Sequence, residues 1–471
     1  MKVRPRERER KHTIMGKWLK AALDYIPQWV EFQMRQHEQP GCVMAVAHKG
    51  RIVLEDAFGH ADLVKGTPLT PRHRFRVASH SKSFTAAGIL KLREQNKLGL
   101  DDRVGHYIKD VHPAVAHVTI AQLLSHSAGI TRDGPDSGQF LDQRPFLNAK
   151  ELKEQLTAAP VIDPNTRFKY SNHGYGLAGF IIEAVTGESY LSWIKREIVD
   201  AAGLDETFPD VPLPKGTPLA CGHSSKLPLG RRVIIAGDYS THAIAPAGGF
   251  VSTARDLARY FAQLSPTAKR SVLSVDSRRE MIRKQWRDPH SSLESYYGMG
   301  IMSGSLGGWN WFGHSGALQG YLTRTSVLAE QDLAVSVLTN AIDGPAHFWL
   351  DGAMHILRIF AQNGAPEGKG RDWMGRWWCL WGAIDLVPMG SKVMVASPEF
   401  FNPFFDASEL EVRSRTEGRI MLAGGYGGHG EPVRLIRNNG GEILEVWLGG
   451  ARFLRETKVV KEMEARYQKR R

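Results

Sequence analysis

Apolar side chains recur at regular spacings along the first part of the chain. Residues 23–37 carry them at helical spacing and predict an amphipathic helix. Residues 42–47 and 52–54 are apolar runs on either side of a turn at Lys49-Gly50, which is the pattern of a β-hairpin. The hairpin indicates that a sheet begins near the N-terminus.

The apolar pattern predicts further helices and strands as far as residue 360. Residues 119–122 and 253–256 each begin with Thr and match a capping box, so a helix is expected to start at each. Residues 321–328 and 333–338 predict two strands, and residues 348–360 predict a helix that returns across their sheet.

The pattern changes after residue 361. Residues 362–371 are polar and Gly-rich with one Pro, as in a linker. Residues 372–457 alternate short apolar runs with Gly, Asn and Pro turns, which predicts a small antiparallel β-domain. We expect a tryptophan cluster to form the core of this domain or its contact with the preceding domain, with a ligand platform as the alternative. The cluster consists of Trp373, Trp377, Trp378 and Trp381.

The composition is that of an ordinary globular protein, with 42% hydrophobic and 23% charged residues. A chain of 471 residues is expected to form two or three domains. The net charge of +12 is concentrated at the two ends. Residues 1–20 carry eight Lys or Arg against two Glu, and residues 458–471 carry six against two. We interpret residues 1–22 and 458–471 as basic tails, and we expect no specific nucleic-acid partner.

Membrane and secretory segments are not expected. No apolar run is long enough to span a membrane, and no apolar region follows the basic residues near Met1. Cys42, Cys221 and Cys379 are far apart and odd in number, so a disulfide framework is not expected. A cytoplasmic location follows from this reading, with Met15 as an alternative start.

The chemistry is expected in the stretch 77–86. Ser79 and Lys82 lie three residues apart, ahead of an apolar run that reaches Leu92, so both should lie near the start of a buried helix. Residues three apart share one helix face, which brings the amine beside the hydroxyl. A lysine whose pKa is lowered by burial can accept the serine proton and activate the oxygen.

The same spacing occurs at Ser192 and Lys195, so it is not specific by itself. There the apolar stripe is formed by Leu191, Ile194 and Ile198. Because the serine and the lysine lie off that stripe, we interpret them as part of a solvated helix face.

Other polar turns precede predicted elements. Tyr170 and Asn172 lie ahead of an apolar helix at residues 177–185, and His314 and Gly316 lie ahead of the strand at 321–328. For His126, at a helix end, we favour a structural role over a catalytic one.

Three of these sites, taken in order, resemble the motifs Ser-x-x-Lys, Tyr-x-Asn and His-x-Gly of the serine β-lactamase and penicillin-binding-protein superfamily. Residues 124–129, 246–249 and 252–257 also resemble its class C and D-aminopeptidase/esterase branch, peptidase family S12. The resemblance covers roughly residues 30–360. The matching residues are Ser79 and Lys82, Tyr170 and Asn172, and His314 and Gly316.

The resemblance implies a fold class and a domain organisation. Residues 23–361 would form an α/β (α+β) domain in which helices flank an antiparallel sheet beside a helical subdomain. After the linker at 362–371, residues 372–457 would form a lipocalin-like β-domain. We expect this second domain to pack against the first through its tryptophan cluster.

The resemblance also implies a mechanism. Ser79 would attack a carbonyl and form an acyl-enzyme, while Lys82 and Tyr170 share the proton transfers. The backbone N–H groups of Ser79 and Ala317 would form the oxyanion hole. No metal and no organic cofactor is required.

Asn172, His314 and Gly316 are implied as substrate-binding residues. Gly316 would let its strand approach closely. β-Lactamases of the superfamily carry a lysine where this chain has His314, and a histidine near its ordinary pKa is mostly neutral at pH 7. We therefore expect poor hydrolysis of penicillins and better turnover of neutral esters, or of amides with a free amino end.

The implied function is hydrolysis of a small ester, amide or short peptide by a carboxylesterase or a D-aminopeptidase-like enzyme. The alternatives are a β-lactamase or D-Ala-D-Ala carboxypeptidase, and a catalytically silent ligand-sensing receptor. The polar, irregular stretches at 130–165 and 205–250 are expected to be surface loops that choose the substrate. Formation of a homo-oligomer stays open.

Overall fold

The computed structural model describes residues 15–467, except 228, 290–293 and 425–426. Contacts within the chain divide it into two compact units: Met34–Asp351, and the residues up to Gln33 together with those from Gly352. The domain boundaries inferred from the sequence stay a prediction. The first fourteen residues of one predicted basic tail and the last four of the other lie outside the described residues.

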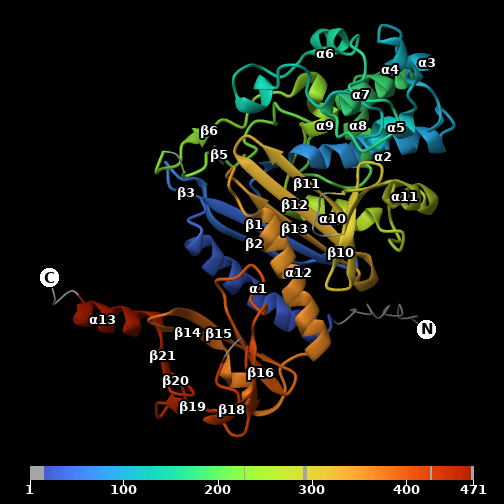
Figure 1. Cartoon of the computed structure of the whole chain (residues 1–471). Coiled ribbons are helices and arrows are strands. Elements are labelled where there is room, and N and C mark those ends of the chain that lie inside the picture. The colour runs from blue at the N-terminus through green and yellow to red at the C-terminus, as the bar shows by residue number, and fades with distance from the viewer. Residues whose placement is uncertain (1–14, 228, 290–293, 425–426, 468–471) are drawn as a thin grey trace, which may run out of the picture. The chain divides into compact units, whose positions relative to one another are not determined.

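A nine-stranded antiparallel sheet forms the centre of the unit Met34–Asp351 (Figure 1). The predicted hairpin is confirmed, and its turn residues Lys49 and Gly50 have φ angles of 51° and 73°. The strands predicted at 321–328 and 333–338 are also present. In spatial order the strands are β3 (Thr67–Pro68), β2 (Arg51–Asp62), β1 (Gly41–His48), β13 (Leu333–Thr339), β12 (Tyr321–Leu328), β11 (Trp309–Leu318), β10 (Met302–Leu306), β9 (Ser295–Tyr297) and β8 (Trp286–Arg287).

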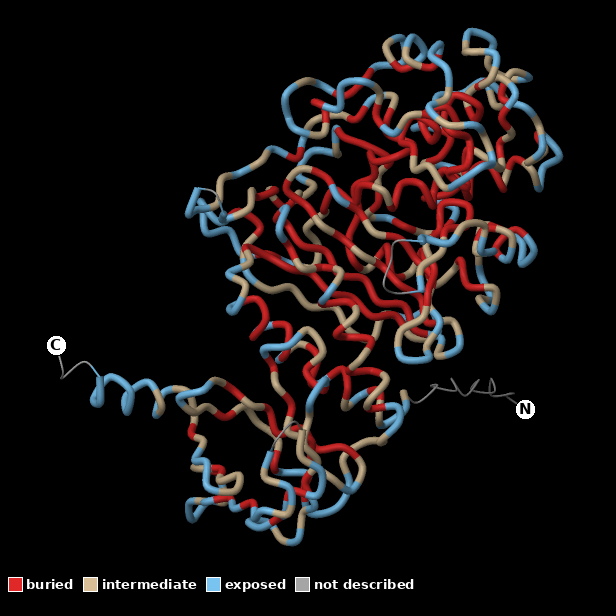
Figure 2. Tube along the Cα trace, viewed as in Figure 1, coloured by how far each residue is buried: buried red, intermediate tan, exposed pale blue. Residues whose placement is uncertain are grey.

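Helices cover this sheet and gather at one end of the unit, as Figure 1 shows for the segment from α2 to α9. α10 packs on β1, β12 and β13, and α2, α7 and α9 pack on one another. The central strands and these helices are mostly buried (Figure 2). The helices are α2 (Ser81–Glu94), α3 (Val104–Tyr107), α4 (Pro113–His117), α5 (Ile120–Leu124), α6 (Ala149–Gln155), α7 (Asn172–Thr186), α8 (Tyr190–Ile194), α9 (Ala245–Gly248), α10 (Ala254–Leu264) and α11 (Val275–Ile282).

Side-chain caps start seven of these helices, including α5, α6 and α10. Thr119 and Gln122 form the predicted capping box of α5, and the Thr253 side chain accepts the Asp256 N–H at 3.2 Å at the start of α10. Asn148 and Glu151 form a capping box for α6. The prediction that residues 130–165 are loop throughout is therefore wrong at α6, and at the turn η2 (Gly138–Leu141).

The second predicted loop, residues 205–250, is likewise interrupted by regular structure. Short elements occur within it. Each spans four residues or fewer, which is too short to show a periodic apolar pattern in the sequence. They are β5 (Gly222–His223), β6 (Ile234–Ile235), η4 (His242–Ile244) and α9.

The other unit contains an eight-stranded closed antiparallel barrel. The predicted antiparallel β-domain is therefore confirmed. The helix that precedes it along the chain, α12, spans Ala346–Asn363. The barrel strands are β14 (Gly375–Cys379), β15 (Gly382–Met389), β16 (Lys392–Ala396), β17 (Ser408–Val412), β18 (Glu417–Leu422), β19 (Pro432–Arg437), β20 (Ile443–Leu448) and β21 (Ala451–Leu454).

Two of the four clustered tryptophans belong to the core of the barrel. Trp373 and Trp377 are fully buried there, whereas Trp381 is 92% exposed on the β14–β15 turn. The Trp378 ring lies 5.7 Å from the ring of Phe32 on α1 (Lys17–Gln36). The cluster is thus divided among three environments, and its predicted contact with the first domain stays a prediction.

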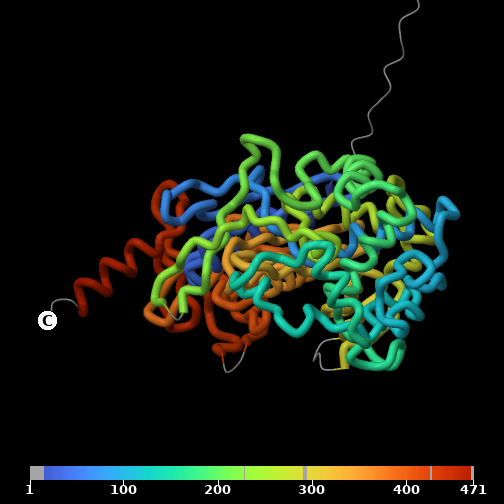
Figure 3. Tube along the Cα trace, turned by 90° about the horizontal axis from the view of Figure 1, so that it is seen from above, coloured from blue at the N-terminus to red at the C-terminus, as the bar shows by residue number. Residues whose placement is uncertain are grey.

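Helix α1 is tied to the barrel region within the same unit. The Tyr25 hydroxyl donates to Asp385 Oδ2 at 2.9 Å, and Trp29 Nε1 donates to the Phe400 carbonyl oxygen at 3.2 Å. At the other end of the chain, α13 (Glu456–Tyr467) extends away from the barrel and has no buried residue (Figure 3).

Candidate active site

Ser79 lies in a short turn, η1 (Ala78–His80), that leads directly into α2. Ala78 has a φ of 48°, a left-handed conformation that is costly for a residue with a β-carbon. Ala78 and His80 are buried, whereas Ser79 is partly exposed. The turn therefore makes Ser79 accessible at the start of an otherwise buried helix.

Lys82 is fully buried beside Ser79. Its Nζ lies 3.1 Å from Ser79 Oγ, 2.7 Å from Asn172 Oδ1 and 2.8 Å from the Ala247 carbonyl oxygen. The structure brings the amine and the hydroxyl together as their three-residue spacing predicts.

Burial lowers the pKa of Lys82 well below its usual value; the carboxylate of Asp133 opposes this and the charge of Arg132 adds to it. The oxygens of Asn172 and Ala247 can only accept hydrogen bonds. A neutral amine therefore gives them its two N–H groups and directs its lone pair at Ser79. In that state Lys82 is placed to accept the Ser79 proton.

Tyr170 is the second group in contact with Ser79. Its hydroxyl donates to Ser79 Oγ at 2.9 Å, and Lys82 Nζ lies 4.7 Å from the centre of its ring. Burial raises the pKa of Tyr170, and the hydrogen bond with Ser79 and the charge of Arg132 oppose this only in part. The phenol is therefore protonated at neutral pH and is a proton donor, not a base, in this state.

Asn172 is held in one orientation by Asp133. Asn172 Nδ2 donates to Asp133 Oδ1 at 2.6 Å, which turns Asn172 Oδ1 toward Lys82. Asp133 Oδ2 in turn pairs with Arg132 Nε at 3.0 Å. Three groups of this site were not predicted: Arg132, Asp133 and the Ala247 carbonyl. The first two lie in an irregular loop without a motif, and the third acts through its backbone.

Strand β11 supplies the third predicted motif along an open edge. β10 pairs with β11 only as far as Gly313, so among the described strands residues 314–318 pair with β12 on one side and with no strand on the other. The buried face of this strand packs against the η1 segment: a β-carbon at Gly316 would collide with the Val77 carbonyl oxygen. Ala317 follows and is exposed. The two segments that carry the predicted oxyanion-hole N–H groups, Ser79 and Ala317, are thus brought together.

His314 lies on the buried side of this strand and is 3% exposed. Its Nδ1 lies 2.7 Å from the Ser315 carbonyl oxygen, which can only accept, so Nδ1 carries the proton. The Tyr297 hydroxyl then donates to Nε2 at 3.1 Å. Burial lowers the pKa of His314 well below its usual value, so the imidazole is neutral at pH 7.

The remaining candidates have structural contacts. His126 Nδ1 accepts the Ser171 N–H at 3.1 Å, and its ring centre lies 4.1 Å from that of Tyr170. The His126 ring therefore lies against Tyr170 and is hydrogen-bonded to the next residue of the chain. Ser192 is exposed and bonds to Ser189 at the start of α8, as expected for a solvated helix face.

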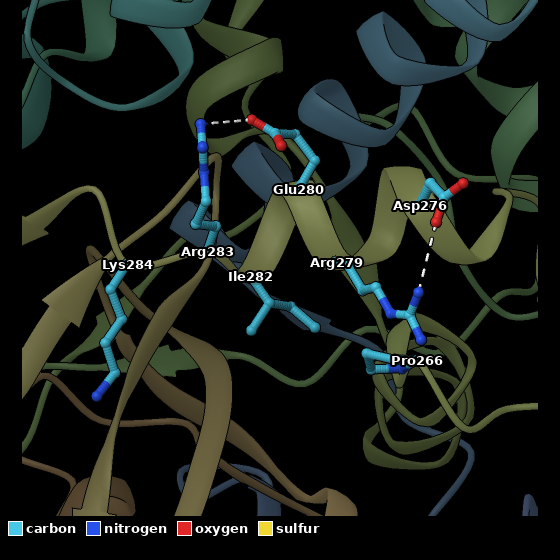
Figure 4. A pocket seen from close by; sticks show the side chains of 7 residues that line it. All are labelled: Pro266, Asp276, Arg279, Glu280, Ile282, Arg283 and Lys284. Carbon is cyan, nitrogen blue, oxygen red and sulfur yellow. Dashed lines mark hydrogen bonds and ion pairs between the residues drawn. The ribbon is translucent and has the colours of Figure 1, made fainter.

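A pocket beside α11 lies apart from this site. Its lining is dominated by charged side chains that pair among themselves, Asp276 with Arg279 at 3.5 Å and Glu280 with Arg283 at 2.8 Å (Figure 4). Within the described part of the chain, no cluster of three His, Cys, Asp or Glu residues is arranged to hold a metal ion. The same residues include no helix with the length and apolarity to span a membrane.

Comparison with known proteins identifies the family. The sequence profile of the Beta-lactamase family matches residues 26–352, so the chain belongs to this family. The chain is 35% identical to Penicillin-binding protein 4* of Bacillus subtilis (strain 168) over 181 residues, which is 36% of this chain and 38% of that protein. The match thus spans well under half of the relative.

Solved structures share the fold. The octameric penicillin-binding protein homologue from Pyrococcus abyssi has a TM-score of 0.64 at 23% identity, covering 92% of this chain and 100% of that one. The D-amino acid amidase from Ochrobactrum anthropi SV3 has a TM-score of 0.63 at 22% identity, covering 72% and 99%. At these identities the likeness confirms the β-lactamase-like fold expected from the three motifs.

Proposed function

We propose that the protein is a serine hydrolase that cleaves an ester or amide bond through an acyl-enzyme on Ser79. The observation that carries the proposal is the pair of contacts at Ser79 Oγ, with the buried Lys82 amine at 3.1 Å and the Tyr170 hydroxyl at 2.9 Å. A base with a lowered pKa and a protonated acid at one hydroxyl are what nucleophilic acyl transfer requires.

The residues divide the reaction between them. Lys82 accepts the Ser79 proton as Oγ attacks the carbonyl carbon, and the N–H groups of Ser79 and Ala317 receive the charge on the carbonyl oxygen. As the bond to the leaving group breaks, Tyr170 gives its proton to the leaving atom and regains one from Lys82. Water then adds to the acyl-enzyme, releases the acid and restores the Ser79 hydroxyl.

Within this class we favour a carboxylesterase or a D-aminopeptidase-like amidase of the S12 type. The neutral His314 supports this choice, because it gives a substrate carboxylate little electrostatic attraction. The structural likeness to a D-amino acid amidase points the same way. A side-by-side assay checks it: kcat/KM is expected to be higher for a neutral p-nitrophenyl ester or a D-amino-acid amide than for benzylpenicillin. A wide preference for penicillin would favour the β-lactamase alternative instead.

Covalent labelling tests the nucleophile. A fluorophosphonate is expected to modify Ser79, as mapped by mass spectrometry, and Ser79→Ala should lower turnover by about three orders of magnitude or more. Ser192→Ala is the matched control, because it removes the other serine with the same spacing to a lysine. This variant should be labelled by the fluorophosphonate and should turn over substrate as the wild type does. An adduct on Ser192, or a Ser79→Ala variant that keeps its activity, would show that the proposal is wrong.

A further inference from the structure

The Ser81 side chain points back at the turn that carries Ser79. Ser81 is fully buried at the start of α2, and its hydroxyl donates to the Ala78 carbonyl oxygen at 2.5 Å. The same Ser81 oxygen accepts the Phe250 N–H at 3.0 Å, which leaves the hydroxyl proton for the Ala78 carbonyl. Ser81 is thus held between η1 and the segment that contains Phe250.

His80 binds the preceding carbonyl of the same turn. Its Nδ1 lies 2.9 Å from the Val77 carbonyl oxygen, which can only accept, so Nδ1 carries the proton. Burial lowers the pKa of His80 to about 3, so the ring is neutral at pH 7 and Nε2 is an acceptor. Thr325 on β12 then donates to Nε2 at 3.1 Å, and Ser336 on β13 donates to Thr325 Oγ1 at 2.9 Å. The Val77 carbonyl is therefore tied through His80 to the central sheet.

These two bonds fix the peptide groups on both sides of Ala78. Ala78 has the left-handed φ of 48°, a conformation that persists only where the surroundings hold it. In a planar trans peptide the carbonyl and the N–H point in opposite directions. The bond from the Ser81 hydroxyl to the Ala78 carbonyl therefore sets the direction of the Ser79 N–H, which is one of the two donors of the proposed oxyanion hole.

We infer that Ser81 is a positioning residue whose hydroxyl aims the Ser79 N–H at the carbonyl oxygen of the substrate. The inference rests on the proposed function, in which that N–H receives the negative charge that develops as Ser79 Oγ attacks. Ser81 is fully buried and acts through the Ala78–Ser79 peptide, while His80 holds the peptide before it. Because the charge develops only on the way to the transition state, the hydroxyl acts on kcat and little on substrate binding.

Ser81→Ala removes one oxygen atom and tests this role. With a neutral p-nitrophenyl ester, kcat is expected to fall about tenfold while KM stays within about twofold. The loss is partial because the Ser81 backbone N–H still bonds to the Ala78 carbonyl. Acylation and deacylation both use the oxyanion hole, so the loss appears whichever step is slower. Ser81→Thr, which keeps a hydroxyl, should recover most of kcat.

Ser83→Ala is the matched control. Ser83 is fully buried on the same helix, and its hydroxyl donates to the His80 carbonyl at 2.7 Å, also three residues back along the chain. This variant loses the same kind of bond, but one that does not act on the Ala78–Ser79 peptide. Both variants should lose a similar amount of thermal stability, and only Ser81→Ala should lose kcat. Equal kinetic losses in the two variants, or an unchanged kcat in Ser81→Ala, would overturn the inference.

A measurement on the backbone separates this inference from the proposed function. Labelling alanine with ¹³C at the carbonyl and serine with ¹⁵N selects the Ala-Ser peptides, of which the chain has three, at residues 78–79, 396–397 and 407–408. Ser79→Cys identifies the first NMR signal by removing it. That signal is expected to shift in Ser81→Ala and to stay in place in Ser83→Ala.

The two possible failures then differ. If Ser79→Ala keeps its hydrolytic activity while the Ala78–Ser79 signal shifts in Ser81→Ala, the proposed nucleophile is wrong and the hold of Ser81 on this peptide stands. If the signal does not move in Ser81→Ala, the role of Ser81 is wrong, whatever the activity of Ser79→Ala.

Discussion

Asp133 affects Lys82 in two ways: its negative charge raises the pKa of the amine, and its hydrogen bond fixes the amide of Asn172. In Asp133→Asn the raising influence is lost, so the pKa of Lys82 falls further. In the pH profile of kcat/KM, the acidic limb reports deprotonation of the base. This limb is expected to move to lower pH. The plateau should fall about tenfold, because an amide oxygen at position 133 is a weaker acceptor than a carboxylate and holds Asn172 less firmly.

Asp136→Asn is the control for that pH profile. Asp136 is a carboxylate three residues further on that pairs with Arg144, and its removal should leave both limbs in place. An acidic limb that stays unchanged in Asp133→Asn, or moves to higher pH, would show that Lys82 is not the titrating base.

At the residue scale, the sequence reveals those pairs of groups that touch because they are close together along the chain. Ser79 and Lys82 meet because one helical turn separates them, whatever the rest of the fold does. Asp133 reaches Asn172 only because a loop folds back onto the start of α7, and no local period encodes that contact. The buried position of His314 also depends on neighbouring strands, so the sequence suggested its neutrality but not its partner Tyr297.

The contact between β11 and η1 sets the geometry of the proposed oxyanion hole, and Gly316 makes this close contact possible. In Gly316→Ala the new methyl collides with the Val77 carbonyl oxygen, so the strand must move away from Ser79. Turnover is expected to fall about a hundredfold, with a loss of about 1–3 kcal/mol in the free energy of unfolding. Steady-state kinetics and urea denaturation measure the two effects.

Gly248→Ala, in α9, is the matched control for the Gly316→Ala variant. A β-carbon at Gly248 meets no atom within 4 Å, so the variant should keep both activity and stability. Wild-type turnover in Gly316→Ala would show that the approach of β11 to η1 does not position the reacting groups.

Elements with a long apolar period or a Thr cap were predictable, and short ones were not. β12, β13 and α5 appear where the pattern placed them. α6 was missed although Asn148 and Glu151 form a capping box, because polar residues surround it and its apolar period is weak. Two-residue strands such as β3 contain no period at all.

At the scale of the whole molecule, helix α1 and the barrel depend on each other. A chain ending at residue 362 leaves Tyr25 and Trp29 without Asp385 and the Phe400 carbonyl, and each lost buried bond costs about 1–3 kcal/mol. We expect that chain to melt earlier and to aggregate. A chain ending at Arg455, which lacks the unburied α13 and the residues after it, should have a free energy of unfolding within about 1 kcal/mol of that of the full chain. Thermal unfolding and soluble yield compare the two, and equal stability would show that α1 does not need the barrel.

The edge strands of the nine-stranded sheet bear on how copies of this protein meet one another. Both edges, β3 and β8, are only two residues long; one contains Pro68, which has no N–H to donate, and the other ends in the charged Arg287. An incoming strand finds almost no ladder to extend at β3 or β8, but β3 pairs with β2 only at His60 and Asp62, so the stretch of β2 from Arg51 keeps a longer edge without a paired strand among the described residues. Edge-to-edge strand addition is therefore disfavoured at β3 and β8, and a strand from another copy would have to pair along β2.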